Sequence, residues 1–572
     1  MRYLRVLILS SILPLLLDSA GVAQLPQCSD QGTWSTYNFT VGGLNIPIGT
    51  PLLLTNGSVM LQYTGSLPNT NQLQDWYLLT PDINGCYGNA NGCSATITPL
   101  ASLVNVWQNP QYGPSAMASA VLSDGKVVIE GGEFNMCQCN SKNRCESNRQ
   151  IRCGQCVGGV GRCETTLGAI YDPQQNTWTA VSPPVDANGN PWTAIGDAPS
   201  TVLPDTRYML GNACSAQTAL FQESSLSWEQ NGDQQAFGAE ENYVQLPNGT
   251  VLAVDTCWPG QPCMTFGGGL NSEAYDPASK TWSSLGDTPQ RLYSYGHGEA
   301  NSCYANSPIF GEQGPSALRP DGTVFVTGAL DQTPTFNYTT HTAVYNTTTR
   351  QWQSSPDLPA VSLGMGSYIV ENEDQSGVVL PDGNFLMVTF PNLYYGTLNS
   401  NILIEWDGRS YCQINNVPDG MYGQLDMLLL PSGQVMFTDV NYWISSNYYL
   451  YTPGGTVYPG IAPTVHQFPN AVLRRGATYT VSGTRFGGYS SGSVFGDDFQ
   501  NYTNYPIVQI RNDASGHVFY ARTHDHSTMG VFTGDTPTYT QMDVPPNMET
   551  GPSHLVVVTN GIASNAVPVN IQ

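Results

Sequence analysis

The feature that most constrains the fold of this chain is a recurring phrase: a short apolar run, an Asn-Gly or Asp-Gly pair, and a second apolar run. The clearest copy runs from Val121 to Gly132, with Asp124-Gly125 between its two runs. Such pairs supply the positive φ angles of a tight turn, so each copy predicts a two-stranded hairpin. The other copies contain Asn56-Gly57, Asn248-Gly249, Asp321-Gly322 and Asp382-Gly383, with degenerate copies at Asp205-Thr206 and Ser432-Gly433.

Aromatic residues follow several hairpins at a similar place. The pattern is a tyrosine with a tryptophan seven residues later, at Tyr171 and Trp178, Tyr275 and Trp282, and Tyr345 and Trp352. Seven hairpins at intervals of about 40 to 80 residues, each followed by room for two more strands, are typical of the four-stranded blades of a β-propeller. We therefore predict an all-β fold with a seven-bladed β-propeller over residues 24–460, whose function is to be sought at its central channel.

The pattern changes near residue 460, where Pro459-Gly460 and Ala462-Pro463 mark a joint. The hairpin phrase does not recur beyond this joint. Short alternating runs, such as 507–510, 518–521 and 554–558, predict strands throughout residues 461–572. A segment of this length and pattern is typical of an immunoglobulin-like β-sandwich.

The N-terminus predicts export. Arg2 and Arg5 precede an apolar stretch from Leu7 to Leu17, and small residues precede Gln24. This order is typical of a signal peptide, here residues 1–23. The alternative is a membrane anchor, but the apolar stretch is shorter than the ~20 residues that span a bilayer. We expect a secreted, extracellular protein with no membrane span after cleavage.

The cysteines favour the same compartment. Six of the 14 lie in one insertion, residues 137–163. Cys153 and Cys156 have the spacing of zinc ligands, but a secreted loop without an apolar core of its own is typically held by disulfides. We predict disulfides without zinc at Cys137, Cys139, Cys145, Cys153, Cys156 and Cys163. The pairs Cys86 with Cys93 and Cys257 with Cys263 are close enough in sequence to close small loops.

Sequons predict N-glycosylation if the chain enters a eukaryotic secretory pathway. They occur at Asn38, Asn56, Asn248, Asn337, Asn346 and Asn501. The sequons at Asn56 and Asn248 fall in predicted hairpin turns, which are expected to be exposed.

The charge balance argues against nucleic acid as a partner. The formal net charge is −24, with only 19 lysines and arginines in the whole chain. A phosphate-binding surface needs clustered basic residues. Solubility is the ordinary reason for such a charge, and a polymeric partner is expected to be neutral or cationic.

The order of signal peptide, seven hairpin repeats and C-terminal sandwich resembles the galactose oxidase and glyoxal oxidase family of secreted copper-radical oxidases. The local matches that carry this resemblance are the segments 422–433, 523–530 and 552–558. The resemblance covers nearly the whole mature chain. It implies a kelch-type seven-bladed propeller followed by an immunoglobulin-like E-set domain.

The resemblance also implies a copper site made by two tyrosines and two histidines. One tyrosine and one histidine should be adjacent, seven to eight residues before the turn of the last blade. That place here holds Gly423 and Gln424, with Tyr422 one position early, and the sequence contains no Tyr-His pair. The sequence therefore departs from the family at this ligand pair.

The remaining copper-site positions also depart from the family. The cysteine that should crosslink to the radical tyrosine is missing near Ala116, and the tyrosine's place is taken by Asp197 or Glu240. Only His524 matches a ligand, with His526 as the rival because the register slips by one residue. A single imidazole holds copper weakly.

Acidic and amide residues stand at the predicted starts of the inner strands instead. They are Asp197, Glu240, Glu241, Glu312, Gln313 and Gln424. The fold should aim them at one end of the central channel, where carboxylates could bind a hard cation such as calcium or the hydroxyls of a sugar. The alternative is that they are solvated loop ends, the ordinary case for carboxylates. His297, in a Gly-hinged loop, is a further candidate ligand or acid-base group, although a lone histidine is more often structural.

Two functional hypotheses follow. The first is a secreted, non-oxidase member of the galactose oxidase-like group that binds carbohydrate or acts in a cell wall or extracellular matrix through the acidic channel. The second is a copper-dependent alcohol or aldehyde oxidase that produces hydrogen peroxide from a shifted site containing Tyr422 and His524. The missing ligands favour the first. Copper enters only the second, and calcium is compatible with the first.

Overall fold

A computed structural model describes residues 25–64, 73–107, 111–136, 160–162, 165–236, 240–256, 270–293, 311–330, 339–363, 366–373, 375–391, 401–421, 423–439, 446–466, 472–495 and 499–572. Within these ranges the chain forms strands, with a 3-10 turn at Leu103–Asn105 and no α-helix, so the predicted all-β fold is confirmed. None of these residues belongs to a helix long and apolar enough to cross a membrane. The predicted signal peptide and all six cysteines of the insertion lie outside the described residues.

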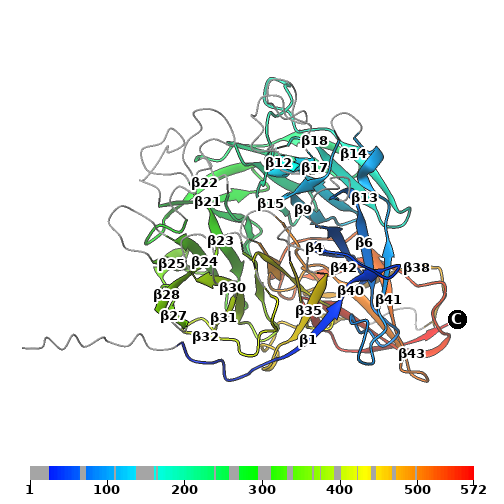
Figure 1. Cartoon of the computed structure of the whole chain (residues 1–572). Coiled ribbons are helices and arrows are strands. Elements are labelled where there is room, and N and C mark those ends of the chain that lie inside the picture. Colours follow the sequence, from blue (N-terminus) through cyan, green and yellow to red (C-terminus); the bar gives the residue numbers. More distant parts are fainter. Residues whose placement is uncertain are drawn as a thin grey trace, which may run out of the picture.

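Six four-stranded antiparallel sheets are arranged as the blades of a β-propeller, as expected from the hairpin repeat (Figure 1). Five are continuous in sequence. The first contains β4 (Ile48–Leu53), β5 (Val59–Tyr63), β6 (Trp76–Thr80) and β7 (Thr96–Pro99); the second contains β9 (Ala118–Val121), β10 (Val127–Glu130), β13 (Gly168–Asp172) and β14 (Thr177–Val181). The third contains β15 (Ser200–Val202), β16 (Tyr208–Asn212), β17 (Ser215–Gln222) and β18 (Ser227–Gln230). The fourth contains β19 (Val244–Gln245), β20 (Val251–Val254), β21 (Asn271–Asp276) and β22 (Thr281–Asp287); the fifth contains β23 (Gln313–Leu318), β24 (Thr323–Leu330), β25 (Thr340–Asn346) and β26 (Gln351–Ser354).

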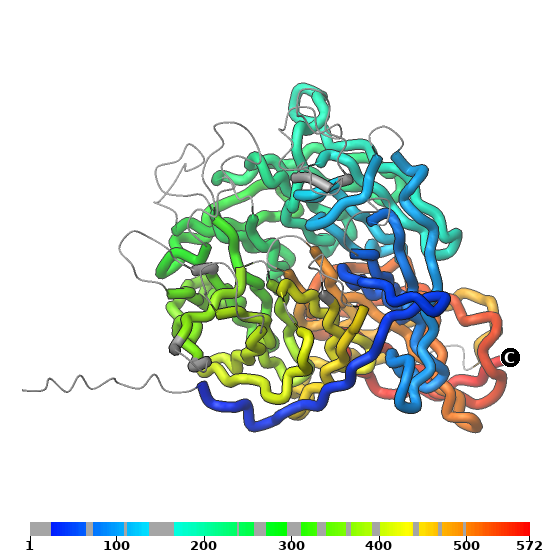
Figure 2. The backbone as a smooth tube through the Cα atoms, viewed as in Figure 1, coloured from blue at the N-terminus to red at the C-terminus, as the bar shows by residue number. Residues whose placement is uncertain are grey.

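The sixth four-stranded sheet joins the two ends of the repeat. It contains β33 (Leu425–Leu429), β34 (Val435–Asp439), β35 (Asn447–Thr452) and, at its outer edge, β1 (Thr33–Asn38) from the start of the chain. In Figure 2 the dark-blue N-terminal tube runs beside the yellow backbone of this region. A disulfide between Cys28 and Cys412 fastens the same N-terminal segment to the chain 384 residues later.

The hairpin phrase at Asp382-Gly383 belongs to a larger, seven-stranded sheet. Its strands are β27 (Ala360–Leu363), β28 (Gly366–Glu371), β29 (Gly377–Val379), β30 (Phe385–Pro391), β31 (Ile402–Trp406), β32 (Tyr411–Gln413) and β39 (Ser493–Val494). The sequence predicted seven blades, and the structure shows six four-stranded sheets together with this larger one. Two small sheets complete this part of the chain: β2 (Thr40–Val41) with β3 (Leu44–Asn45), and β8 (Pro114–Ser115) with β11 (Phe134–Met136) and β12 (Val160–Arg162).

The hairpins themselves are confirmed. Every copy of the phrase forms the turn between two consecutive antiparallel strands of one sheet, and each turn contains a residue of positive φ, from 74° at Thr206 to 91° at Gly383. The Tyr/Trp pattern is a cross-strand pair on the outer two strands, with ring centroids 5.0 Å apart for Tyr171 and Trp178. Pairs of this kind stabilise adjacent strands.

The tail of the chain forms a nine-stranded sheet. Its strands are β36 (Thr464–Val465), β37 (Val472–Leu473), β38 (Thr478–Thr484), β40 (Ile507–Asn512), β41 (Val518–His524), β42 (Pro537–Asp543), β43 (Gly551–Thr559), β44 (Ile562–Ala563) and β45 (Val567–Ile571). It has an apolar core of its own, which includes Val481, Ile510 and Leu555. Most strands alternate buried and exposed residues, as the sequence pattern indicated.

A segment of the tail enters the centre of the propeller. We call residues 489–505, of which 496–498 are not described, the axial segment. Within it, β39 pairs with β29, and the axial segment also bonds to the first strands of several four-stranded sheets. The contacts are Tyr505 Oη to Leu53 O, Ser119 Oγ to Gln500 O at 3.4 Å, Tyr502 Oη to Ser200 O at 3.4 Å, and Asn501 Nδ2 to Met427 O at 2.7 Å. The axis that the sequence analysis treated as a channel is occupied by the protein's own chain.

We predict that replacing Cys28 and Cys412 together by serine lowers the free energy of unfolding by about 2–5 kcal/mol, because the disulfide closes nearly the whole repeat. Urea denaturation without reductant measures this. The matched control is the double serine variant of Cys86 and Cys93, whose disulfide confirms the predicted small loop and spans only 7 residues. It should cost less, and equal losses would contradict the prediction.

We predict that Asn501→Ala lowers the free energy of unfolding by about 1–3 kcal/mol, since it leaves the buried Met427 carbonyl without its donor. Asn501 is 2% exposed, whereas Asn105 is an exposed asparagine on a 3-10 turn. Asn105→Ala should therefore change the stability little. A loss for Asn501→Ala no larger than for this control would show that the axial segment is not held as described.

Candidate functional site

We call the strand that precedes each hairpin turn a first strand; these are β4, β9, β15, β19, β23, β29 and β33. The two ends of the first strands lie in different surroundings. The hairpin turns, where first strands end, contact the tail: Thr523 N donates to Thr55 O at 3.2 Å, and Thr528 Oγ1 donates to Pro204 O at 2.7 Å. The starts of the same strands are therefore at the opposite end of the propeller, which we call the distal end. Asp197, Glu240, Glu312 and Gln424 each lie within a few residues before the start of one of these strands, so they belong to the distal end.

Glu240 and Glu312 from neighbouring sheets meet at the distal end. Their backbones form a parallel bridge in which Gln313 N donates to Glu240 O at 3.1 Å. Both residues are buried, with 4% and 9% of their surfaces exposed. Asn242 donates to Gln313 Oε1 at 3.1 Å from its side chain and to Gly314 O at 3.0 Å. The structure thus brings Glu240, Glu312 and Gln313 together, in a setting rich in amides.

Glu241, which the sequence predicted, belongs to a second cluster of carboxyls at the same end, whose other members, Asp255 and Glu273, the sequence analysis missed. Its carboxylate accepts a hydrogen bond from Gln234, and Asp255 and Glu273 lie beside it. Glu273 accepts from the backbone N–H groups of Gln235 at 2.9 Å and Ala236 at 2.8 Å. Asp255 follows β20 and Glu273 lies early in β21, so both are carried to the distal end by strands other than the first, where the sequence pattern gave no signal.

The pKa values of these three carboxyls are all raised. Burial raises the pKa of Asp255, and the negative charges of Glu273 and Glu241 raise it further. Burial also raises the pKa of Glu273, but its two backbone donors stabilise its charged form. The neutral form is therefore favoured more at Asp255 than at Glu273. Burial, followed by the charge of Glu273, raises the pKa of Glu241 as well.

Further buried carboxyls lie at the distal end in other sheets. Burial raises the pKa of Asp426 to about 7, with Thr50 N donating to it at 2.9 Å, and burial raises the pKa of Glu371 to about 7. Burial raises the pKa of Glu130, whose carboxylate has no hydrogen-bond partner among the described residues. Asp197 is 5% exposed and precedes β15. Gln424 precedes β33 and is half-buried.

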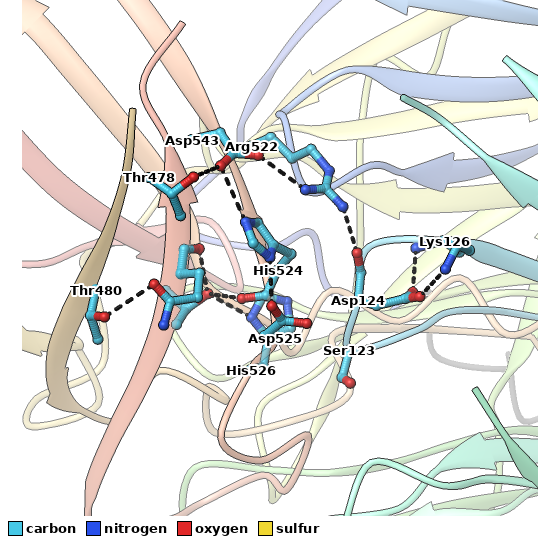
Figure 3. A network of polar contacts seen from close by, with 12 residues as sticks. Ser123, Asp124, Lys126, Thr478, Thr480, Arg522, His524, Asp525, His526 and Asp543 are labelled. Carbon is cyan, nitrogen blue, oxygen red and sulfur yellow. Dashed lines mark hydrogen bonds and ion pairs between the residues drawn. The ribbon is translucent and has the colours of Figure 1, made fainter. Parts of the chain in front are cut away.

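The histidine expected in the alternative copper site lies elsewhere (Figure 3). His524 ends β41, with Nδ1 2.9 Å from Asp525 Oδ2 and Nε2 3.3 Å from Asp543 Oδ1. Arg522 donates to Asp543 Oδ2 at 3.1 Å and to Asp124 O, in a hairpin turn, at 2.7 Å. Both ring nitrogens of His524 are thus engaged by carboxylates at the boundary between tail and turns, the end opposite to Gln424.

The rival histidine is also structural in its surroundings. His526 is buried, its Nδ1 lies 2.8 Å from Thr540 Oγ1, and its backbone N–H donates to Ser123 O at 3.3 Å. Burial lowers the pKa of His526 to about 3, so the ring is neutral. Tyr422 and His297 lie outside the described residues. The structure therefore does not bring His524 and the residues beside Tyr422 to one end of the propeller.

The predicted modification sites differ in their surroundings. Asn248 is exposed, and Asn38, Asn56 and Asn346 are half-buried, while Asn337 is not described. The prediction for Asn501 is wrong for the folded protein, because its Nδ2 is buried on the axis and donates to Met427 O. Sequence alone could not reveal that this sequon enters the propeller.

Among the described residues, few possible metal ligands lie close enough together to hold one ion. There, a compact group of three possible ligands occurs at Cys28, Glu405 and Cys412, but these cysteines form a disulfide. A sulfur in a disulfide is not a thiolate ligand. The distal carboxyls are spread over several sheets rather than gathered into such a group.

No protein-family model and no curated protein sequence matches this chain. Similar solved structures include virginiamycin B lyase from Staphylococcus aureus, with 8% sequence identity, a TM-score of 0.38, and coverage of 73% of this chain and 99% of that chain. Hydrazine synthase from Kuenenia stuttgartiensis has 12% identity, a TM-score of 0.33, and coverage of 58% and 74%. Similarities at this level carry no argument about function.

We predict that stability falls as the pH rises from about 4 to about 7, because carboxyls such as Asp426 stay protonated in the folded protein and ionise in the unfolded chain. Their contribution is fully present below their ordinary pKa and is lost as the pH rises through the raised pKa. Asp426→Asn cannot ionise, so its stability should fall less steeply, by ~1.4 kcal/mol per pH unit within this window.

Denaturation at several pH values measures this difference. Asp287→Asn, at an exposed carboxylate at the end of β22, is the control and should follow the wild-type pH dependence. Parallel curves for Asp426→Asn and the wild type would show that Asp426 is ionised in the folded protein.

Proposed function

We propose that this protein is a secreted, non-oxidase propeller protein that binds neutral carbohydrate, such as a wall or matrix polymer, at its distal end. The observation that carries the proposal is the meeting of Glu240 and Glu312 from neighbouring sheets, beside Asn242 and Gln313. Carboxyl and amide groups held rigidly side by side can accept from and donate to several sugar hydroxyls at once. Calcium is compatible with the same oxygen atoms but is not required.

The raised pKa values favour a neutral ligand over a cation. A buried carboxyl that keeps its proton offers both a donor and an acceptor, which suits hydroxyl groups. A hard cation instead needs ionised oxygens. The raised pKa of Asp255, caused by burial and by the charges of Glu273 and Glu241, therefore supports the carbohydrate proposal more than a calcium site.

The oxidase alternative has less support. Its histidine, His524, has both ring nitrogens on carboxylates at the tail-facing end. The positions of the ligand pair hold Gly423 and Gln424. Copper needs several nitrogen donors in one fixed geometry.

We further propose that the larger sheet supplies a seventh blade, made of β29–β32, and that residues 461–572 form an immunoglobulin-like domain of the galactose oxidase-like kind. The first part is supported by contacts of β29 with both β23 and β33, as between first strands of neighbouring blades, and by the turn at Asp382-Gly383. The second is supported by the tail's separate apolar core and antiparallel pairing. With this seventh blade, the proposed propeller spans residues 24–460.

The test is binding of the purified mature protein to cellulose, chitin and β-1,3-glucan. We predict that Glu240→Gln and Glu312→Gln each weaken binding to the retained polymer by roughly tenfold or more, since each replaces a carboxyl oxygen that can accept from a sugar hydroxyl by an amide nitrogen that cannot. The control Asp287→Asn should bind like the wild type. Thermal unfolding of each variant separates loss of binding from loss of fold.

Two outcomes would overturn the proposal. The first is a failure of the wild type to bind any of the three polymers, or wild-type binding by both glutamine variants. The second concerns the oxidase: copper-loaded protein that shows a tyrosyl radical absorption and releases peroxide from galactose or a small aldehyde would replace the carbohydrate-binding assignment.

A further inference from the structure

A groove of about 490 Å³ lies between the β19–β22 sheet and the β23–β26 sheet, away from the distal site. Its lining includes the turn residues Asn248 and Thr250 on one side and Arg350 on the other. Apolar groups, among them Leu246 and Leu285, also line it. A volume of this size can hold a ligand of one or two sugar rings.

The groove contains polar groups that the fold does not use. Arg350 forms no ion pair with any described residue, although the chain carries a net charge of −24. Asn248 Oδ1 accepts from Thr250 Oγ1 at 2.8 Å and from Thr250 N at 3.2 Å. Its Nδ2 has no acceptor among the described residues. The amide nitrogen is therefore free in a turn that forms the edge of the groove.

Asn248 is the acceptor of the sequon Asn248-Gly249-Thr250, and modification would take place at this free Nδ2. We propose that the glycan on Asn248 folds back and that its first sugars occupy the groove between these two sheets. The proposal rests on the secretory route of the proposed function, but not on carbohydrate binding at the distal end. The occupant is thus part of the protein itself.

The chemistry of the groove matches an N-acetylglucosamine unit. The apolar floor suits the C–H face of a sugar ring, and the rim offers the hydroxyl of Ser283 and the guanidinium of Arg350. The hydroxyl oxygens of Thr250 and Thr347, whose protons are donated to Asn248 and Gly322, remain available as acceptors. Attachment at Asn248 keeps the sugar beside the groove, so a weak contact is occupied at high effective concentration. A free sugar would lack this advantage.

The neighbouring sequon supplies a matched control. Thr348 of the sequon Asn346-Thr347-Thr348 lines the groove, but Asn346 itself does not. A glycan on Asn346 starts outside the groove, and Asn346→Gln removes it. Ser283 is an exposed residue of β22 whose side chain lines the groove, so Ser283→Trp fills the groove without entering the core.

The experiment follows release of the glycan by a peptide amidase from folded protein secreted by a eukaryotic host. Mass spectrometry of the Asn248 peptide gives occupancy and the rate of release. We expect Asn248 to be glycosylated and its release to become roughly tenfold faster in Ser283→Trp and in Arg350→Ala, because a seated glycan reacts only when it leaves the groove. Asn248→Gln should lower the melting temperature more than Asn346→Gln does.

An unmodified Asn248 would overturn the proposal, as would equal release rates in the wild type and in Ser283→Trp. Thermal unfolding checks that both groove variants are folded. Polymer binding by Asn248→Gln should stay at the wild-type level, because the distal site is separate. Equal release rates in the wild type and in Ser283→Trp, with wild-type polymer binding intact, therefore reject the groove alone. Slower release in the wild type than in Ser283→Trp, without polymer binding, rejects the distal site alone.

Discussion

The hydrogen bonds between the axial segment and the first strands of the sheets are the interaction on which the rest of this structure depends. First strands in a propeller have one edge toward the axis, and an edge buried without partners leaves costly unsatisfied backbone groups. Here β39 pairs with β29, while Tyr502 and Asn501 donate to carbonyls of other first strands. The tail and the propeller are thus joined by direct hydrogen bonds at the axis, not only by the chain that connects them.

This arrangement explains why the distal end is rich in protonated carboxyls. With the axis filled, groups at the starts of the first strands lose water on the inner side and become buried, as Glu241 and Asp426 are. Burial penalises the charged form, so the pKa of each such carboxyl is raised. The acidic composition of the chain therefore does not translate into an equally charged site, and the site is suited to hydroxyl groups.

The hairpins could be predicted from sequence because their signal is local. Asp124-Gly125 and its counterparts need positive φ at a fixed place, and the alternating runs around them set the strands. The meeting of Glu240 with Glu312 could be anticipated in the same way, because each residue stands before a first strand. Asp255 and Glu273 could not, since their position depends on strand pairing within a sheet.

The position of the axial segment also could not be predicted from local sequence patterns. Asn501 and Tyr502 look like an ordinary exposed loop with a sequon, and only the packing of tail against propeller buries them. The same packing moves His524 and His526 to the tail-facing end, although their sequence match suggested a copper ligand. Both wrong predictions, the exposed sequon at Asn501 and the copper ligand at His524 or His526, arise because contacts between residues far apart in the sequence set these positions.

The separation of the two ends has a functional consequence. At the tail-facing end, Arg522, Asp543 and the backbone of Asp124 are already engaged with one another, so their charges are used to join tail and turns. At the distal end the starts of the first strands are held in place from the axial side, so the loops that precede them can differ in sequence at little cost to the scaffold. Substitutions in these loops therefore leave the contacts that hold the propeller closed in place, which is the property that the proposed binding role at the distal end requires.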